Sequence, residues 1–211
     1  MVNRIEKKVY KPAGMWYCKL DVKNSLRLER ETMRDQTRML VLAALFAVVT
    51  AAANFIKIPI GVVPITLLFF ATALSGVLLG PKWGAVSQAV YVVLGLVGLP
   101  IFTGGGGLGY VFQPSFGFLL GLIPAAWVIG MVSRGEPGPV RVALAALAGL
   151  GVLYLVGLPY LWFILNVYLD KAMALPALLW SGMLIFLPGD FLKIAGVTAL
   201  YRPLRRALDR R

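Results

Sequence analysis

The sequence predicts an all-α integral membrane protein with six transmembrane helices and both termini in the cytoplasm. The 211 residues are 59% hydrophobic and only 14% charged, whereas a soluble domain is typically about 45–50% apolar and about 25% charged. The apolar residues form continuous runs, unlike the alternating pattern of a membrane β-barrel. The charged residues gather near the two ends of the chain. Together these observations exclude an ordinary soluble domain.

Six apolar segments have about the length needed to cross a bilayer, which is roughly 17–25 residues. Gly80-Pro81-Lys82 separates the second from the third, and the RGEPGP sequence at 134–139 separates the fourth from the fifth. A short helix on the membrane surface is predicted over residues 171–179, because Asp170 and Lys171 belong near the headgroups. The predicted spans cover residues 39–55, 62–79, 83–97, 115–132, 140–157 and 183–201.

The distribution of basic residues predicts the orientation. The net charge is +12, with ten of the 21 Lys and Arg in residues 1–38 and five in residues 202–211. With six spans, 18 basic residues fall on the side of the termini and only Lys57 and Lys171 on the other, while Lys193 lies inside the membrane. This asymmetry follows the positive-inside rule. The same distribution argues against nucleic-acid binding.

Three regions follow from this pattern. They are a basic cytoplasmic tail over residues 1–38, a six-helix membrane domain over residues 39–205, and a basic cytoplasmic tail over residues 206–211. The first tail has no apolar h-region, so it is not a signal peptide. Because Met33 lies six residues before the first apolar run, we expect residues 1–32 to be dispensable or to result from an upstream start codon.

Several chemistries are excluded. With one cysteine, Cys18, and no histidine, the chain has no intrachain disulfide, no thiolate or imidazole metal site, and no Ser-His or Cys-His catalytic pair. The GxxxxGK[ST] phosphate loop is absent from the sequence, so the chain does not hydrolyse ATP by that route. We expect no cofactor.

The Asp190 and Lys193 pair in LPGDFLK is the strongest candidate for a functional site. An ionisable side chain inside a bilayer costs about 2.5–3.5 kcal/mol and usually marks a site. Residues three apart are neighbours on a helix, so mutual neutralisation is the alternative interpretation. Pro188-Gly189 fits the start or a kink of a helix there.

A glycine-rich segment, Gly104 to Gly107 and Gly109, has two interpretations. It lacks the strand–helix context of a nucleotide-binding fingerprint. A flexible linker is one interpretation. However, the segment has no charge and carries Tyr110 and Phe112, which favours a lid or a pocket wall that comes close to a ligand.

Two further features have both packing and binding interpretations. Gln88 and Tyr91 lie three residues apart on one helix face, where a buried amide can bond a neighbouring helix or a ligand. Ala43, Ala47 and Ala51 form a small-xxx-small row in the first span. Such a row lets another helix approach closely, either in a partner protein or in the same bundle.

The run GPKWGAVSQAVYVVLGLVGLPIFTGGGGLGYVFQPSFGFLLG at 80–121, followed by LPGDFLK at 187–193, resembles the BioY family. These are the biotin-capturing S components of energy-coupling-factor (ECF) vitamin transporters, and the resemblance covers about residues 33–205. It implies a six-helix protein of the bacterial or archaeal cytoplasmic membrane that takes up biotin from outside. It also implies a transmembrane T component and two cytoplasmic ATPases as partners.

The resemblance also implies roles for particular residues. It assigns biotin binding to Asp190, Lys193 and Gln88, and Tyr91 lies on the same helix face as Gln88. It places Gly106 and Gly107 against the ligand and the loop at 62–66 over it. The alanine row, with Ala43 and Ala47, would contact the T component. An ionised Asp190 could accept the ureido N–H groups, while Lys193 could neutralise Asp190 or meet the carboxylate of biotin.

The chain departs from the usual family pattern at Leu68, at Gln113-Pro114-Ser115 and at Phe118. Two alternative functions therefore stay open. One is an S component for another vitamin. The other is an intramembrane enzyme, which would need a Ser/Lys pair such as Ser181 and Lys193. These two residues would stand about 18 Å apart along one helix.

Overall fold

The structure is a computed structural model that describes residues 22–58, 64–171 and 173–209. The chain divides into two compact units, residues 1–38 and 39–211. In the first unit, residues 22–38 are helical and form the start of α1 (Val22–Phe55). Arg, Glu and Leu favour helices, although we had predicted only a tail here. Residues 1–21 lie outside the described part, so the dispensability of residues 1–32 stays a prediction.

The second unit is built from helices, which confirms the predicted helical class. Helix α3 packs against α2 and α4, and α6 packs against the same two helices. The helices are the end of α1, α2 (Leu68–Leu96), α3 (Phe116–Val132), α4 (Pro139–Phe163), α5 (Leu175–Leu179) and α6 (Leu187–Asp209). Three short turns accompany them: the 3-10 turn η1 (Leu108–Phe112) and the π-helical turns η2 (Ile164–Tyr168) and η3 (Trp180–Leu184).

Four helical stretches of the described residues are long and apolar enough to cross a membrane. This supports the assignment to the membrane. Helix α3 is also apolar but shorter. The four stretches are Thr32–Phe55, Leu68–Leu96, Pro139–Tyr168 and Leu175–Leu208.

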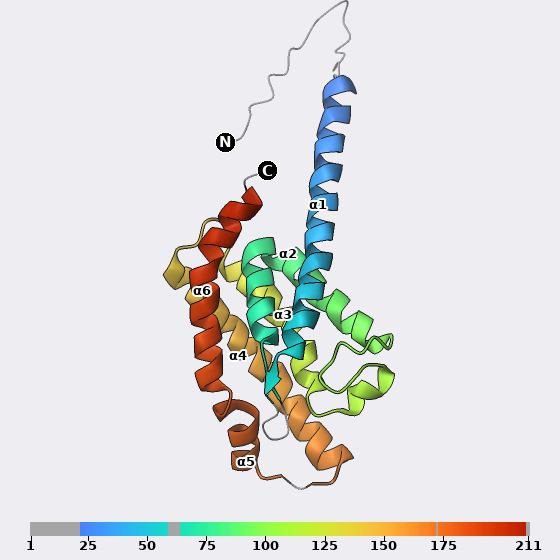
Figure 1. The fold of residues 1–211 in the computed structure, drawn as a ribbon, viewed down its shortest axis with the longest axis vertical. Helices are drawn as coiled ribbons and strands as arrows, with labels where there is room; N and C mark the ends of the chain where they lie inside the picture. The colour runs from blue at the N-terminus through green and yellow to red at the C-terminus, as the bar shows by residue number, and fades with distance from the viewer. Residues whose placement is uncertain (1–21, 59–63, 172, 210–211) are drawn as a thin grey trace, which may run out of the picture. The chain divides into compact units, whose positions relative to one another are not determined.

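Helix α2 consists of two segments that meet at Gly80, as the sequence predicted. Gly80 has φ 79° and ψ −177°, which is not helical and which glycine adopts at little cost. Pro81 then starts the second segment, a position where its fixed φ suits a helix. A Cβ built on Gly84 would lie 2.9 Å from the Gly76 Cα atom, so the segments touch next to the break, and the second segment runs back at an angle to the first (Figure 1).

The second predicted span begins six residues too early. Helix α2 starts at Leu68, not Val62. Before it, β1 (Lys57–Ile58) and β2 (Ile65–Thr66) form an antiparallel pair, with Lys57 opposite Thr66. Strands of two residues are too short to show an alternating pattern. Within the predicted covering loop at 62–66, residues 62 and 63 lie outside the described part.

Four helix boundaries in the C-terminal half also differ from the prediction. Helix α4 continues past residue 157, through Pro159, to Phe163. The short helix α5 starts at Leu175 rather than 171. The last helix starts at Leu187, where Pro188 suits the first turn, and runs to Asp209 instead of ending at 201. Its last turns include Arg206, and basic residues there interact favourably with the helix dipole.

Candidate ligand-binding site

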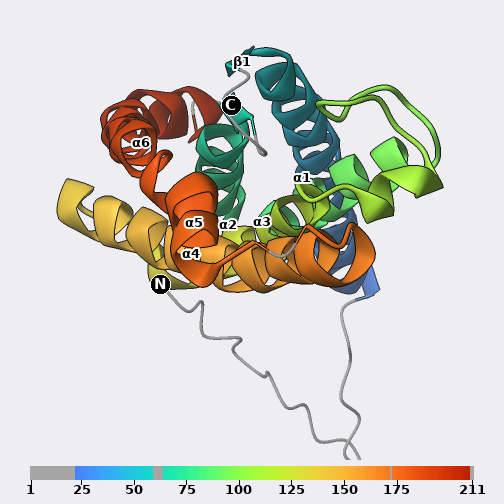
Figure 2. The same cartoon turned by 90° about the horizontal axis from the view of Figure 1, so that it is seen from below.

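Two adjacent cavities lie within the second unit and share four lining residues. Pro64, Phe69, Phe118 and Leu153 line both. The cavities are small, with volumes of about 60 and 70 Å³. Together the two cavities are called the passage below; its lining is mostly apolar, and each cavity carries a different polar group. The glycine-rich segment and α6, which supply the two ends, lie on opposite sides of the bundle (Figures 1 and 2).

One end of the passage carries the charged pair predicted from the sequence. Lys193 Nζ donates to Asp190 Oδ1 at 2.8 Å, and the two side chains are only 9% and 6% exposed. The Tyr154 hydroxyl donates to Asp190 Oδ2 at 2.5 Å. Asp190 lies in the first turn of α6, where the helix dipole stabilises a carboxylate. This group of Asp190, Lys193 and Tyr154 is called the acidic cluster below.

The acidic cluster keeps unused hydrogen-bonding capacity. A carboxylate can accept about four hydrogen bonds and an ammonium can donate three. The structure shows one side-chain bond to each Asp190 oxygen and one from Lys193. All three side chains line the same cavity. The cluster can therefore offer an acceptor and a donor side by side to a ligand.

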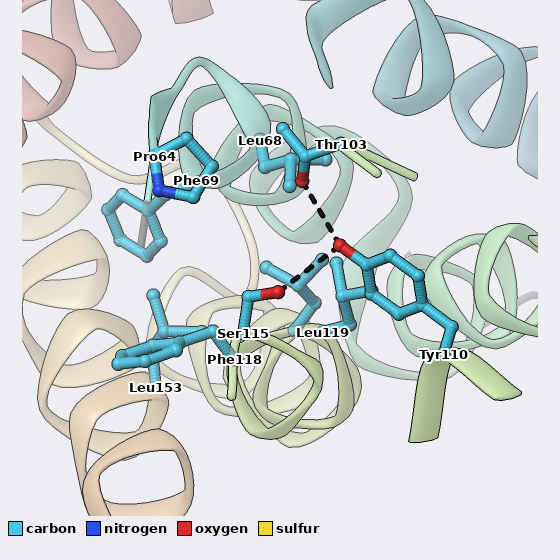
Figure 3. A pocket seen from close by; sticks show the side chains of 10 residues that line it. Pro64, Leu68, Phe69, Thr103, Tyr110, Ser115, Phe118, Leu119 and Leu153 are labelled. Carbon is cyan, nitrogen blue, oxygen red and sulfur yellow. Dashed lines mark hydrogen bonds between the residues drawn. The ribbon is translucent and has the colours of Figure 1, made fainter. Parts of the chain in front are cut away.

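The other end of the passage is a group of neutral hydroxyls. The Tyr110 hydroxyl lies 3.3 Å from Thr103 Oγ1 and 3.1 Å from Ser115 Oγ. Figure 3 shows it pointing toward both. All three residues line the cavity. Leu68, Ser115 and Phe118, where the chain departs from the family pattern, line it as well.

Gln88 lies outside both cavity linings and is fully buried in a polar network. Its Nε2 donates toward Thr50, Ser75 and Ser87 at 3.1–3.2 Å. Its Oε1 accepts from Thr72 at 3.0 Å. These partners come from α1 and from both segments of α2. The arrangement favours the packing interpretation of Gln88 over ligand binding.

Tyr91 is also buried away from the cavities, and it supports the glycine-rich segment. Its hydroxyl donates to the Ile101 carbonyl at 3.3 Å, and its ring meets Phe102 edge-on at 5.6 Å. Asn54 Nδ2 donates to the same Ile101 carbonyl at 2.7 Å. Lys57 Nζ donates to the Thr103 carbonyl at 2.7 Å. Contacts from α1, β1 and α2 thus hold this segment in place.

The glycine-rich segment is a packed structure, which contradicts the linker interpretation. The Gly107 N–H donates to the Gly95 carbonyl at 2.8 Å. A Cβ on Gly106 would lie only 2.1 Å from the Leu99 carbonyl oxygen, so only glycine fits there. Gly106 and Gly107 are absent from both cavity linings, whereas Thr103 and Tyr110 of the same segment face the cavity.

The structure packs the alanine row within this chain, which favours the second of its two interpretations. Ala43 and Ala47 are each only 2% exposed and belong to the core of this chain, and Ala51 packs against that core. Small residues at these positions let the other helices of the same unit approach α1. A partner protein therefore cannot reach Ala43 and Ala47 in this conformation. The outward side of α1 instead presents Leu40, Val41, Leu45 and Val48.

Tyr154 and Phe118 are site residues that the sequence did not single out as ligand contacts. Their rings meet edge-on, with centroids 6.3 Å apart. A tyrosine in the middle of the otherwise apolar run at 150–157 was an available signal, since a buried hydroxyl usually has a partner. The identity of that partner, 36 residues away, could not be read from local sequence.

A helical membrane protein whose internal passage is apolar, with polar groups at its two ends, is suited to holding a small molecule. The BioY family model matches residues 23–210, and the chain belongs to this family. This confirms the predicted resemblance. It also confirms the predicted transport class over the intramembrane enzyme.

Named relatives and a solved structure agree with this membership. A probable biotin transporter BioY of Lysinibacillus sphaericus is 43% identical over 180 residues, covering 82% of this chain and 92% of the relative. A biotin transporter BioY of Rhodobacter capsulatus is 38% identical, covering 79% and 95%. The crystal structure of the S-component for biotin from an ECF-type ABC transporter matches with a TM-score of 0.70 and 27% identity, covering 82% of this chain and 93% of that one.

Proposed function

We propose that this chain is the substrate-binding subunit of a biotin uptake transporter. It captures biotin at the outer face of the membrane and delivers it inward together with energy-coupling partners. The observation that carries the proposal is the acidic cluster, which faces an apolar cavity in a member of the BioY family. Relatives named biotin transporters support the choice of ligand.

The chemistry of biotin suits the two ends of the passage. Its ureido group places N–H donors beside a carbonyl acceptor. Asp190 and Lys193, 2.8 Å apart, present the complementary acceptor and donor. Such charge-assisted bonds are about twice as strong as neutral ones. Phe69, Phe118 and Leu153 would cover the apolar ring, and the hydroxyls around Tyr110 would meet the far end of the ligand.

Biotin needs both cavities, so binding requires the shared side chains to move. The cavities measure about 60 and 70 Å³, and Phe69 and Phe118 line both. We infer that these two rings rotate when biotin enters. Pro64, which also lines both cavities, belongs to the segment expected to cover the ligand.

The proposed topology has six spans with cytoplasmic termini in a bacterial or archaeal cytoplasmic membrane. The reversal at Gly80 supports counting the two segments of α2 as two spans. The basic residues at both ends of the chain support the orientation. We further propose a T component and two cytoplasmic ATPases as partners, with the outward side of α1 as the contact in place of the buried alanine row.

The decisive test is biotin titration of the purified full chain carrying Asp190→Asn. The variant keeps the size of the side chain but loses the charge that pairs with Lys193. Since hydrogen bonds to charged groups contribute about 1.5–3 kcal/mol each, we expect affinity to fall by about 100-fold. Asp170→Asn is the matched control: Asp170 is exposed, and asparagine tolerates its φ of 48°.

Two outcomes would change the proposal. Equal biotin affinity in Asp190→Asn and in the control would remove the acidic cluster from the site. If the wild-type chain instead retained a different vitamin that biotin could not displace, the fold and family would stand and the substrate would be replaced. A competition panel of vitamins on the wild-type chain distinguishes these results.

A further inference from the structure

A third, larger cavity lies on the outside of the bundle, in a groove between α4 and α6. Its volume is about 690 Å³. Helix α4 contributes Ala143 and Leu147, and α6 contributes Phe191, Ala195 and Ala199. The small alanine side chains leave room between the two helices. This groove has no part in the proposed biotin site, because the two share no lining residue.

The chemistry of the groove changes along its length. From Phe191 to Ala199 its lining is apolar apart from Thr198, whose hydroxyl is already bonded to the Ile194 carbonyl at 2.8 Å. The lining ends at Arg202, which is exposed. Arg206 lies one turn further along the same helix face. Along α6, the groove is therefore apolar first and then ends at cationic side chains.

The length of the groove indicates what kind of molecule it can bind. Phe191 and Arg202 are eleven residues apart on α6, or about 16 Å at 1.5 Å per residue. Half of a hydrocarbon core of about 30 Å is about 15 Å. The groove therefore covers one leaflet. A transmembrane helix of a partner would need a contact surface through both leaflets, whereas a single lipid needs only one.

We propose that this groove is a binding site for an anionic phospholipid. One acyl chain lies along Ala143, Ala195 and Ala199, and the phosphate group meets the Arg202 guanidinium. Arginine suits phosphate oxygens because its planar fork donates two parallel hydrogen bonds. The site lies in the leaflet next to the C-terminal end of α6, which is the cytoplasmic leaflet in the proposed topology. The proposal does not depend on which vitamin the chain carries.

Native mass spectrometry of the detergent-purified full chain tests the headgroup contact. Phosphatidylglycerol and phosphatidylcholine with identical acyl chains are added in turn. We expect the wild-type chain to retain phosphatidylglycerol preferentially. One basic residue near a membrane surface is worth about a five-fold difference in binding, so Arg202→Gln should reduce this preference about five-fold. Arg134→Gln removes the same charge from an exposed loop position outside the groove and should leave the preference unchanged.

A second substitution tests the acyl-chain contact. Ala199→Leu fills the groove at an exposed position and should lower retention of both lipids, whereas Ala52→Leu, at an exposed position on α1, should not. Equal lipid retention in all four variants would overturn the proposal. So would an Ala199→Leu variant that keeps its lipid but loses a co-purifying T component, because the groove would then receive a protein. An unchanged unfolding temperature shows that each variant is folded.

Discussion

Two buried polar groups in this molecule illustrate different uses of polarity inside a membrane protein. The network around Gln88 bonds both the amide oxygen and the amide nitrogen to hydroxyls from α1 and α2, and Gln88 borders neither cavity of the passage. The acidic cluster around Asp190 also has internal bonds, but all its members border a cavity and keep capacity for more. In sequence the two look alike, as polar residues in apolar spans. The difference lies in whether hydrogen-bonding capacity is left over where a ligand can reach it.

The two polar groups therefore contribute to two different free energies, that of folding and that of ligand binding. Hydrogen bonds between side chains of neighbouring helices stabilise helix packing, by about 0.6 kcal/mol per interhelical bond on average in a membrane. Bonds that remain available at a cavity contribute to ligand affinity. A substitution in the Gln88 network should therefore change stability more than affinity. A substitution in the acidic cluster should change affinity strongly.

The largest effect is expected from Lys193→Met. Removing one partner of a buried ion pair leaves the other charge uncompensated, at a cost of about 3–5 kcal/mol. It also removes the only cation among the described residues that line the two cavities of the passage. We expect biotin affinity to fall by at least about 100-fold, measured by titration in detergent, together with a lower unfolding temperature.

Lys171→Met is the control for this experiment, because Lys171 is exposed and lines neither cavity. It should bind biotin like the wild type. If Lys193→Met bound biotin within a factor of three of wild type, the ion pair would be a self-neutralising structural element. The contrast between the two polar groups would then disappear.

A smaller effect is expected from Tyr154→Phe, which sharpens the contrast within the acidic cluster. Its hydroxyl bonds Asp190 Oδ2 at 2.5 Å, so the variant leaves the carboxylate oriented by the Lys193 side chain alone, without adding a charge. A bond to a charged group contributes about 1.5–3 kcal/mol, and we expect biotin affinity to fall by about ten-fold or more. Tyr168→Phe, at an exposed position, is the control.

A double-mutant cycle separates positioning from general packing. If Tyr154 acts by orienting Asp190, Tyr154→Phe should cost far less affinity in the Asp190→Asn background than in the wild type. Equal costs in both backgrounds would show that the tyrosine ring, and not its bond to Asp190, supports the site.

Much of the fold could be predicted because apolar length and turn residues act locally. The break at Gly80 follows from glycine and proline next to each other, and the Asp190–Lys193 pair follows from helical spacing. The outcome for Gln88 and Ala43 could not be predicted in the same way. Both lie on helices that are apolar on nearly every side, so the pattern does not show which side faces a cavity, a neighbouring helix or lipid.

Contacts between segments that are distant in the sequence could not be predicted either. The bond from Tyr154 to Asp190 joins α4 to α6, and the bond from Lys57 to the Thr103 carbonyl joins β1 to the glycine-rich segment. Neither has a local signature. The aromatic residues of the glycine-rich segment favoured a lid or pocket wall over a linker; the segment is packed against its neighbours, while its role as a lid stays a prediction. Which of its residues face the cavity depended on the three-dimensional arrangement.

The smallest change in affinity is expected from Gln88→Leu, and it tests the comparison from the other side. The variant removes the centre of the network, but its hydroxyl neighbours keep bonds to backbone carbonyls, such as Thr50 to Phe46 at 2.8 Å and Ser87 to Gly84 at 2.8 Å. No buried donor is left without an acceptor there.

At about 0.6 kcal/mol per lost interhelical bond, we expect Gln88→Leu to lose about 2 kcal/mol in stability, seen as a lower unfolding temperature. Biotin affinity of the folded protein should stay within about three-fold of wild type, as it should for the exposed control Gln36→Leu. A ten-fold loss of affinity at an unchanged unfolding temperature would return Gln88 to the ligand site, and would mean that its network opens when biotin binds.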